Sequence, residues 1–567
     1  MKTVRRVLVL AFVMAFLAAG MWGARPVPPA KAATCTWTGT NGTSWTDPGN
    51  WSGGVPGAAD TAIIGPATNN PVVTASTTVG TVTIQSGGLL TYNGGSGVTF
   101  SITTFNIEDG GRYIHNRAAA TPLNTATGRN FSSNSTVEIQ QNLVGLGAAL
   151  PTFGNLIINS SAAVQMAGYL STVNGTLTKQ NTGDFRLATT QVVNLTIGGN
   201  LNVQGGTMTI QSETTANTAS VSVAGSVSIG SATLQRGANA TGLWTFNVGG
   251  NWTNNGIFTS GNSTVTFNGS GEQTIGGSAV TAFNNLTVNS GATVVIPTSN
   301  TPTVAGALTN NGALRQTRSV SGSSDIEFLN VSTNKYYGVM INPGGNNLGS
   351  TTVTVYGNQM CSAPPSLGKD PILRCFEIQP TSQQAATVRL YYRTAELNSN
   401  NASTVNIYHQ KSGQWNLEEG TYTRETDPGD GYYSVQVTGV DEYSPFTAGN
   451  HGPTLIHLAS FTATPQPGRI HLAWTTDSET DNYGFHVWRA QSAGGPYTRL
   501  NAALIPARGG PTQGASYTFD DAAVTDGVTY YYKLEDVDVH GASVFHGPAV
   551  ALAGRFYRLY LPLVARE

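Results

Sequence analysis

The sequence predicts an all-β protein: a right-handed parallel β-helix-like solenoid followed by two β-sandwich domains. Three observations predict this class. Only 10 % of the 567 residues are charged, and 68 residues are Gly. Apolar and polar residues alternate in short runs separated by Gly and Asn, which is the period of a β-strand. One short pattern recurs at intervals of 24 to 29 residues, which is typical of stacked repeats.

The shortage of charge excludes several classes of protein. An ordinary soluble domain has about 25 % charged residues. Disordered polyelectrolytes, coiled coils and nucleic-acid binders each need abundant Lys, Arg or Glu. A polytopic membrane protein is excluded because no second apolar run approaches the ~20 residues that a spanning helix requires.

Residues 1–32 have the pattern of a signal peptide. Lys2, Arg5 and Arg6 precede an apolar stretch over 7–23, and Ala30-Lys31-Ala32 offers a small-x-small cleavage site. A retained N-terminal anchor is the alternative. Removal of this segment leaves 23 basic and 30 acidic residues, a net charge of −7, and no transmembrane segment. We therefore expect an exported protein, extracellular or at the cell surface, that binds neither nucleic acid nor anionic lipid.

Residues 33–78 form a Trp-rich segment that we expect to cap the solenoid. Trp37, Trp45 and Trp51 occur together with an Asn-Trp and a Pro-Gly pair. In these features the segment resembles the N-terminal segment found before β-helical repeats in bacterial secreted and surface proteins. The indoles either pack as a hydrophobic cap or form a platform on which sugar rings stack. In the second case Trp252, on the rod, is a further carbohydrate-binding candidate.

Residues 79–320 are expected to form the solenoid. The recurring pattern is Val or Ile, any residue, Gly, any residue, then an apolar residue, and it starts at Val173, Ile197, Val223, Val248, Ile275 and Val304. Three short strands in each ~26-residue repeat predict roughly nine coils between 79 and 318. Charged residues are under 6 % of 33–320, against 15 % of 321–567. Stacked coils explain this difference, because a charge would face its equivalent on the next coil.

Residues 321–450 are expected to form a β-sandwich, because the alternating runs become longer and more aromatic. Cys361 and Cys375 close a short loop in an exported protein, so we predict a disulfide that contributes ~3 kcal/mol. Cys35 then has no partner cysteine. It is either a buried cysteine or a thiol that is free or forms an intermolecular disulfide.

Residues 454–553 resemble a fibronectin type III domain over their whole length. The residues that carry this resemblance are 461–463 (FTA), 470–474 (IHLAW), 484–489 (GFHVWR), 517–520 (YTFD) and 530–534 (YYYKL). The resemblance implies a spacer or binding module, with Trp474 between the sheets and Tyr530 or Tyr532 bonded across a corner. The tail over 554–567 is an edge strand or a sorting signal.

Few residues offer chemistry. Glu108, Asp109, Arg112 and Arg117 cluster in the repeats, and we interpret them as a turn or an ion-paired surface. The sequence contains none of the common hydrolase, zinc or phosphate-binding motifs.

One group of residues in the last domain is a candidate for metal binding. Asp477, Glu479 and Asp481 alternate in a loop that would bind Ca²⁺, with a solvated acidic loop as the alternative. His471 and His486 should point to solvent, and their spacing does not support a metal site. We expect no other cofactor.

Three functions remain as hypotheses. The first is a non-catalytic exported protein with a structural or adhesive role at the cell surface or in the extracellular matrix, whose partner is a glycan or a surface protein. The alternative is a carbohydrate-binding protein that uses the named tryptophans. The third is a β-helix enzyme that cleaves polysaccharides, which needs carboxylates and a basic residue that converge on one face.

Overall fold

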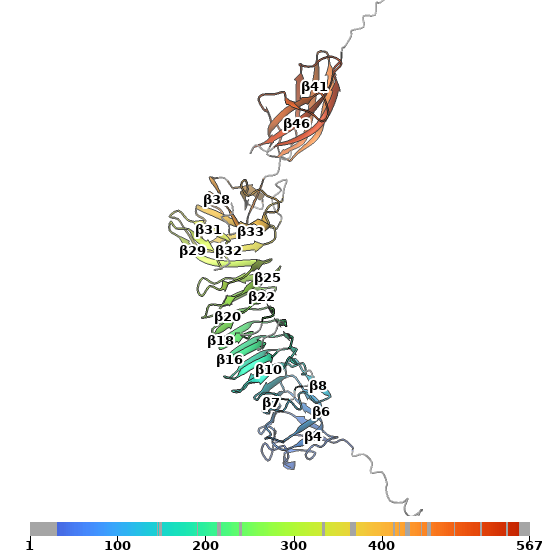
Figure 1. Ribbon diagram of the computed structural model, residues 1–567, viewed down its shortest axis with the longest axis vertical. Helices are drawn as coiled ribbons and strands as arrows, with labels where there is room; N and C mark the ends of the chain where they lie inside the picture. The colour runs from blue at the N-terminus through green and yellow to red at the C-terminus, as the bar shows by residue number, and fades with distance from the viewer. Residues whose placement is uncertain are drawn as a thin grey trace, which may run out of the picture. The chain divides into compact units, whose positions relative to one another are not determined.

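A computed structural model describes residues 31–554 except 145, 147–149, 190, 212–216, 238–240, 332–334, 363–369, 412–413, 419, 426–430, 444, 451–454, 481, 511–512 and 540–542. Nearly all of the predicted signal peptide and of the tail therefore lies outside the described residues. Within the described ranges the chain is built from strands and two 3-10 helices, and no α-helix is present (Figure 1). None of these residues forms a helix long and apolar enough to cross a membrane. The chain divides into two compact units, Met1–Gln316 with Val331–Tyr336, and Thr317–Asn330 with Tyr337–Glu567.

The first unit is a β-solenoid of about 12 turns, which confirms the predicted class. Parallel strands stack along one side in two consecutive sheets. The first sheet contains β1 (Thr34–Thr36), β2 (Thr61–Ile64), β4 (Thr77–Ile84), β6 (Phe100–Ile107) and β8 (Gly128–Phe131). The second contains β12 (Thr172–Val173), β15 (Val193–Ile197), β17 (Ala219–Val223), β19 (Trp244–Val248), β22 (Ser263–Phe267), β25 (Asn285–Val288) and β28 (Leu308–Asn310).

The remaining solenoid strands pair in parallel from coil to coil, and a 3-10 helix, η1 (Pro48–Asn50), lies between β1 and β2. These strands are β3 (Val72–Val73), β5 (Leu89–Tyr92), β7 (Arg112–His115), β9 (Thr136–Ile139), β10 (Asn155–Asn159), β11 (Val164–Gln165), β13 (Leu177–Gln180), β14 (Asp184–Ala188), β16 (Leu201–Gln211), β18 (Val227–Gln235), β20 (Trp252–Asn254), β21 (Ile257–Thr259), β23 (Glu272–Gly276), β24 (Ala282–Phe283), β26 (Thr293–Val295), β27 (Thr303–Val304) and β29 (Ala313–Ser321).

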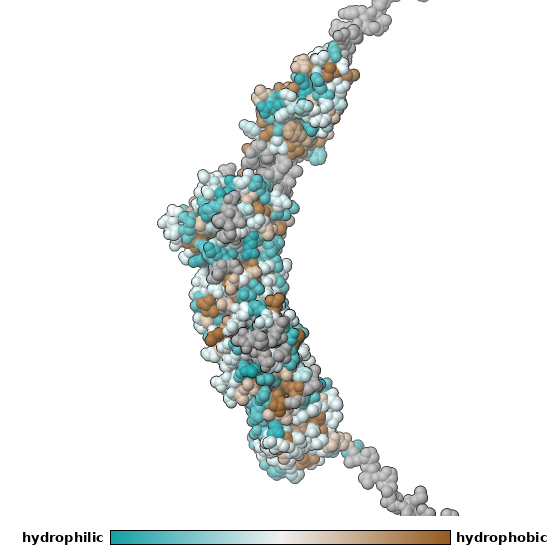
Figure 2. All heavy atoms as spheres, viewed as in Figure 1, coloured by the Kyte–Doolittle hydropathy of each residue, from teal (hydrophilic) through white to brown (hydrophobic). Residues whose placement is uncertain are grey.

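The interior of the solenoid is a set of apolar columns. Leu195, Val221, Phe246, Val265 and Leu286 lie opposite one another on successive strands, and all are buried. Because side chains alternate across a strand, their neighbours face outward. On the face shown in Figure 2, hydrophilic and intermediate residues cover most of the solenoid, and apolar residues form small scattered patches.

Outward positions form hydrogen-bonded ladders. Thr83, Asn106 and Asn130 are in register. The Asn106 amide donates to Thr83 Oγ1 at 3.2 Å, and the Asn130 amide donates to Asn106 Oδ1 at 2.9 Å. Amide and hydroxyl groups donate and accept, so equivalent residues on neighbouring coils attract where equivalent charges would repel.

A second ladder runs along one corner of the solenoid. At each step a side-chain oxygen on one coil accepts a hydrogen bond from a backbone N–H on the next. The steps are Asn155 to Thr176, Thr176 to Asn200, Asn200 to Ser226, Ser226 to Asn251, and Asn251 to Thr274, at 2.8 to 3.4 Å. The Gly of the recurring pattern makes room for these side chains, because a Cβ on Gly250 would lie 2.5 Å from Ser226 Oγ.

The register corrects part of the predicted repeat. Val173, Ile197, Val223 and Val248 follow one another in register, as expected. The next residue in this column is Phe267, whereas Ile275 lies opposite Trp252 on another strand and Val304 lies opposite Phe283. The same short pattern therefore occurs at more than one corner of the solenoid.

The parallel ladder also begins earlier than predicted. Thr34 of β1 already lies opposite Thr61 of β2, so the Trp-rich segment is itself part of the parallel stack. Trp51 contacts Trp37 and Trp45 edge to face, with ring centroids 5.0 and 4.7 Å apart. These indoles fill the interior of the first coils. The early start and the shorter late coils explain why there are about 12 turns and not nine.

The second unit begins with an antiparallel β-sandwich. One sheet, which we call the cleft sheet, has the order β30 (Ile326–Phe328), β31 (Val339–Asn342), β34 (Ala386–Arg393), β38 (Tyr432–Val440) and β37 (Tyr422–Glu425). The other strands are β32 (Asn347–Gly357), β33 (Arg374–Pro380), β35 (Asn406–Lys411), β36 (Gln414–Leu417) and β39 (Pro445–Gly449), and η2 (Thr394–Glu396) follows β34. The predicted disulfide joins Cys361 and Cys375.

The remaining strands of the second unit form two antiparallel sheets that share one core. They are β40 (Leu455–Gln466), β41 (Arg469–Thr480) and β45 (Ser516–Asp521) in one sheet, and β42 (Asn482–Ala490), β43 (Thr498–Arg499), β44 (Ile505–Pro506), β46 (Thr529–Asp538) and β47 (Ser543–Leu552) in the other. Trp474 is fully buried and stacks on Tyr517 at 5.3 Å. The Tyr530 hydroxyl accepts a hydrogen bond from the Thr525 backbone N–H at 3.1 Å, so Tyr530 makes the expected corner contact.

Removing the disulfide should destabilise the first sandwich. The crosslink spans 14 residues, and closing such a loop is worth about 3 kcal/mol. We expect a Cys361→Ser, Cys375→Ser double variant of the full chain to lose about this much free energy of unfolding in that sandwich alone. Denaturant melting followed by hydrogen exchange resolves the domains. Reduction of the disulfide should cause the same loss of stability in the original chain and no change in the variant. A loss of stability located in the solenoid would contradict the placement of the disulfide in the sandwich.

The solenoid interior predicts a loss of stability in acid. His115 is fully buried, and its Nδ1 and Nε2 lie 3.0 Å from Tyr113 Oη and 2.9 Å from the Ala119 carbonyl oxygen. Burial lowers the pKa of His115 from 6.5 to about 4. Between these values the unfolded chain binds a proton that the folded chain does not. The free energy of unfolding therefore keeps its full value with respect to His115 above pH 6.5. It falls by about 3 kcal/mol as the pH is lowered to about 4.

A His115→Gln variant tests this expectation. It should flatten the dependence of unfolding free energy on pH between 6.5 and 4. An unchanged pH dependence in the His115 variant would assign the acid sensitivity to other groups.

Candidate ligand-binding cleft

A cavity of about 500 Å³ lies against the cleft sheet. Ligand sites in proteins span about 300–1,000 Å³. We call this cavity the tyrosine cleft, and its lining residues are Asp325, Glu327, Tyr337, Met340, Arg389, Tyr391, Glu425, Tyr432, Tyr433 and Ser434. The alternation along β34 places Arg389 and Tyr391 on the cleft side, because Val388, Leu390 and Tyr392 are buried in the core.

Tyrosine rings build one wall of the cleft. Tyr391 stacks on Tyr337 with centroids 5.1 Å apart, and Tyr432 meets Tyr337 edge to face at 5.1 Å. The Tyr391 backbone N–H donates to the Gly338 carbonyl at 3.1 Å, which fixes the two stacked rings side by side. Burial raises the pKa of Tyr391, so its hydroxyl is protonated at neutral pH and able to donate a hydrogen bond.

The polar groups of the cleft are held in place by one another. Arg389 Nη1 donates to Glu425 Oε2 at 3.0 Å, and Arg389 Nε donates to Gln436 Oε1 at 3.0 Å. Ser434 Oγ donates to the same Glu425 oxygen at 3.1 Å. Each group is therefore oriented before a ligand arrives, which lowers the entropy cost of binding.

Two more carboxylates complete the lining. Asp325 Oδ1 accepts a hydrogen bond from the Asn342 amide at 2.6 Å, and Glu327 Oε2 accepts one from the Asn330 amide at 3.1 Å. Half-exposed aromatic rings beside oriented acceptors and a guanidinium suit a ligand with apolar faces and hydroxyl edges.

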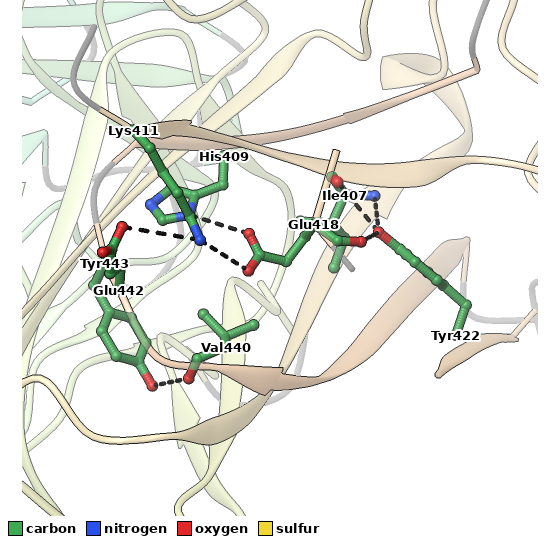
Figure 3. Close-up of polar contacts among 8 residues, drawn as sticks. All are labelled: Ile407, His409, Lys411, Glu418, Tyr422, Val440, Glu442 and Tyr443. Atoms are coloured by element: carbon green, nitrogen blue, oxygen red, sulfur yellow. Dashed lines mark hydrogen bonds and ion pairs between the residues drawn. The ribbon is translucent and has the colours of Figure 1, made fainter. Parts of the chain in front are cut away.

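The same sandwich contains a buried polar network away from the cleft (Figure 3). His409 Nδ1 lies 3.1 Å from Glu418 Oε2, and the His409 ring stacks on Phe446 at 4.3 Å. Lys411 Nζ reaches Glu418 Oε1 at 3.7 Å, and the Tyr422 hydroxyl donates to the Glu418 carbonyl oxygen at 2.7 Å. The His409 and Glu418 side chains are buried, so their contact fastens the β35–β36 hairpin and is not open to a substrate.

The candidate tryptophans do not form a platform. Trp37, Trp45, Trp51 and Trp252 are at most 5 % exposed. The Trp252 ring contacts Phe258 at 4.8 Å inside the coil, and its Nε1 donates to Thr281 Oγ1 at 3.2 Å. All four indoles are therefore packed in the interior, which agrees with the packed alternative and not with the platform. Trp252 faces inward from β20, whereas Trp37, Trp45 and Trp51 lie outside the named strands.

The three candidate Ca²⁺ ligands are not brought together. The Glu479 carboxylate is buried and accepts hydrogen bonds from the Tyr517 hydroxyl at 2.7 Å and the Gly509 backbone N–H at 2.9 Å. Asp477 is exposed and pairs with His457 at 2.8 Å, and Asp481 lies outside the described residues. Over the described ranges no three His, Cys, Asp or Glu side chains are grouped to hold a metal.

His471 and His486 differ in their exposure to solvent. His471 pairs with Asp520 at 2.7 Å and is partly exposed, as expected. His486 is only 7 % exposed, so the expectation that it points to solvent was wrong. Arg499 Nη1 lies 3.4 Å from its Nε2.

The charged group in the repeats forms no site. Glu108 and Asp109 lie in the exposed turn after β6, which agrees with the turn interpretation. Arg112 pairs with Glu138 and not with Glu108, and Arg117 donates to the Gly94 carbonyl at 2.9 Å. Cys35 is buried 3.6 Å from the Gly53 carbonyl oxygen, and this burial raises the pKa of its thiol.

The tyrosine cleft was not predicted from the sequence. Its signal is the alternation in β34, where Arg389 and Tyr391 interleave with Val388 and Leu390. Polar and aromatic residues on the solvent side of a strand indicate a binding face, provided that their partners on other strands are known.

Comparisons with known proteins give limited similarity. Residues 36–144 match a family described as a domain of unknown function, DUF8693, and this match joins the tryptophan segment to the first coils. No curated protein matches the chain. An Fn3-like protein from Clostridium thermocellum is similar at 18 % identity, with 19 % of this chain and 100 % of that chain covered and a TM-score of 0.14. A β-1,2-glucanase from Parabacteroides distasonis is similar at 12 % identity, with 43 % of this chain and 37 % of that chain covered and a TM-score of 0.13.

Proposed function

We propose that this chain is a non-catalytic exported protein with a structural or adhesive role at the cell surface or in the extracellular matrix. The tyrosine cleft carries the proposal, because it is a preorganised cavity of ligand size on a rigid sheet. The Cys361–Cys375 disulfide supports export, since such crosslinks persist in oxidising compartments. A fibronectin type III-like role for 454–553 as spacer or binding module belongs to the same proposal.

The solenoid supports a structural role. Its described carboxylates hold local structure: Asp60 accepts hydrogen bonds from the Ala33 and Gly57 backbone N–H groups, and Glu138 accepts them from Arg112, Gln140 and Asn159. Asp184 and Glu272 pair with arginines. Carboxylates committed in this way are poorly placed as the convergent acid and base of a polysaccharide-cleaving enzyme.

The geometry of the cleft favours carbohydrate as the adhesive ligand. Tyr337 and Tyr391 are half-buried, so part of each ring faces the cavity. Sugar rings present apolar C–H faces to aromatic rings, and their hydroxyls match the carboxylate and guanidinium groups beside them. The carbohydrate-binding hypothesis is therefore retained, with tyrosines of the cleft sheet in place of the buried tryptophans.

Titration of the full chain with oligosaccharides in a calorimeter tests this function. We expect binding of a neutral oligosaccharide, and Tyr391→Ala should weaken it about tenfold, since a central aromatic contact is worth roughly 1.5 kcal/mol. Tyr391→Phe keeps the ring and should retain most of the affinity. Asp441→Asn, on the same sandwich outside the cleft, is the control.

Two results would contradict the proposal. If cellulose-, xylan- and chitin-derived oligosaccharides all fail to bind, carbohydrate is not the ligand. If reducing ends accumulate during incubation, the protein is an enzyme and not a passive adhesive.

A further inference from the structure

We infer that the tyrosine cleft selects saccharides that carry protonated amines over neutral and acidic saccharides. This inference rests on the proposed carbohydrate binding and names the class of sugar. It comes from the charge of the cleft, which is independent of the tyrosine wall.

The charge of the lining is unbalanced. Asp325, Glu327 and Glu425 supply three carboxylates, and Arg389 is the single cation among the lining residues. Arg389 is paired with Glu425 at 3.0 Å, so these two charges offset each other. Asp325 and Glu327 remain without an ion pair to a lining residue. Two arginines border the lining: Arg318 donates to the Glu327 carbonyl oxygen at 2.6 Å, and Arg393 Nε donates to the Tyr432 hydroxyl at 2.9 Å.

Each of these two carboxylates keeps an oxygen for a ligand. The Asn342 amide engages Oδ1 of Asp325, and the Asn330 amide engages Oε2 of Glu327. Among the described residues, no hydrogen-bond donor reaches the second oxygen of either side chain. An ammonium group has three donors and no acceptor, so it suits these free carboxylate oxygens better than a sugar hydroxyl does.

The position of Glu327 directs such an amine towards the aromatic wall. Glu327 lies opposite Met340 on β31, and Met340 lies opposite Arg389 on β34. The row Glu327–Met340–Arg389 therefore places an anion at one side of the cleft and a cation at the other, with Tyr391 two residues along β34 from Arg389. A ring stacked on Tyr391 would orient a protonated amine to the Glu327 side.

An acidic saccharide meets the opposite field. A uronate would face Asp325 and Glu327, and Arg389 is already engaged by Glu425. Each unit charge at about 4 Å in a solvated site changes affinity about fivefold. We therefore expect the order amino sugar, then neutral sugar, then uronate.

Calorimetric titration of the full chain tests this order. The probes are a β-1,4-linked glucosamine tetramer, its fully N-acetylated form and a galacturonate tetramer, at a mildly acidic pH that keeps the amines protonated. The glucosamine tetramer should bind at least about fivefold more tightly than the N-acetylated one, and added salt should reduce this ratio. The galacturonate should bind most weakly.

Variants separate charge from stacking. Glu327→Gln and Asp325→Asn should each reduce the preference for the amine about fivefold while neutral binding persists. Asp441→Asn, a matched loss of one carboxylate outside the cleft, should leave the preference unchanged. Tyr391→Ala should weaken the amino and the neutral tetramer by the same factor.

The outcomes separate the two claims. If no tetramer binds, the proposed carbohydrate function fails. If the N-acetylated tetramer binds at the cleft and the amine brings no gain, only the present inference is overturned. If a lysine-rich peptide binds as tightly as the glucosamine tetramer and is indifferent to Tyr391→Ala, the cleft is an acidic protein-docking site and the inference is also overturned.

Discussion

In-register parallel stacking is the constraint on which the solenoid depends. Each residue of one coil lies about 4.8 Å from its equivalent on the next, so the same side-chain chemistry is repeated along the stack. Inward columns such as Leu195, Val221 and Phe246 gain by this repetition because apolar groups pack on one another. Outward columns would suffer from it if they were charged. In the amide and hydroxyl ladders, such as Thr83, Asn106 and Asn130, the stacked side chains attract one another through hydrogen bonds.

The constraint also explains where a ligand site is found. In a stacked column each side chain must be compatible with a similar side chain on the next coil. Such a column rarely brings an acid, a base and an aromatic ring together at one point. The antiparallel sandwich has no such repetition, and the cleft sheet places an acid, a methionine and an arginine side by side at Glu327, Met340 and Arg389. Charge is correspondingly concentrated after residue 320. The molecule thus separates a repetitive, weakly charged solenoid from a sandwich that carries diverse chemistry.

The sequence was sufficient for the fold class and for the disulfide, because strand alternation, Gly-rich corners and paired cysteines are local signals. The sequence was insufficient wherever the position of a side chain depended on which residues pair between strands. Ile275 fits the repeat pattern but lies opposite Trp252, and no local feature distinguishes one corner from another. Trp252 stayed a carbohydrate-binding candidate for the same reason, since a one-residue shift moves a side chain to the opposite face of a strand. The cleft joins Glu327 to Glu425, almost a hundred residues apart, and only the strand order brings them together.

A double-mutant cycle on the solenoid tests the stacking constraint most directly. Thr196 and Ser222 are outward neighbours in one column, and Thr266 lies in the same column two rungs beyond Ser222. In the Thr196→Lys, Ser222→Lys double variant the two ammonium groups should repel each other. The cycle should show a coupling of about 0.5–1 kcal/mol in unfolding free energy. Lysines at 196 and 266 are about 14 Å apart and beyond the screening length in physiological salt, so their effects should add. Additive effects in both pairs would contradict the view that in-register charge repulsion shaped this sequence.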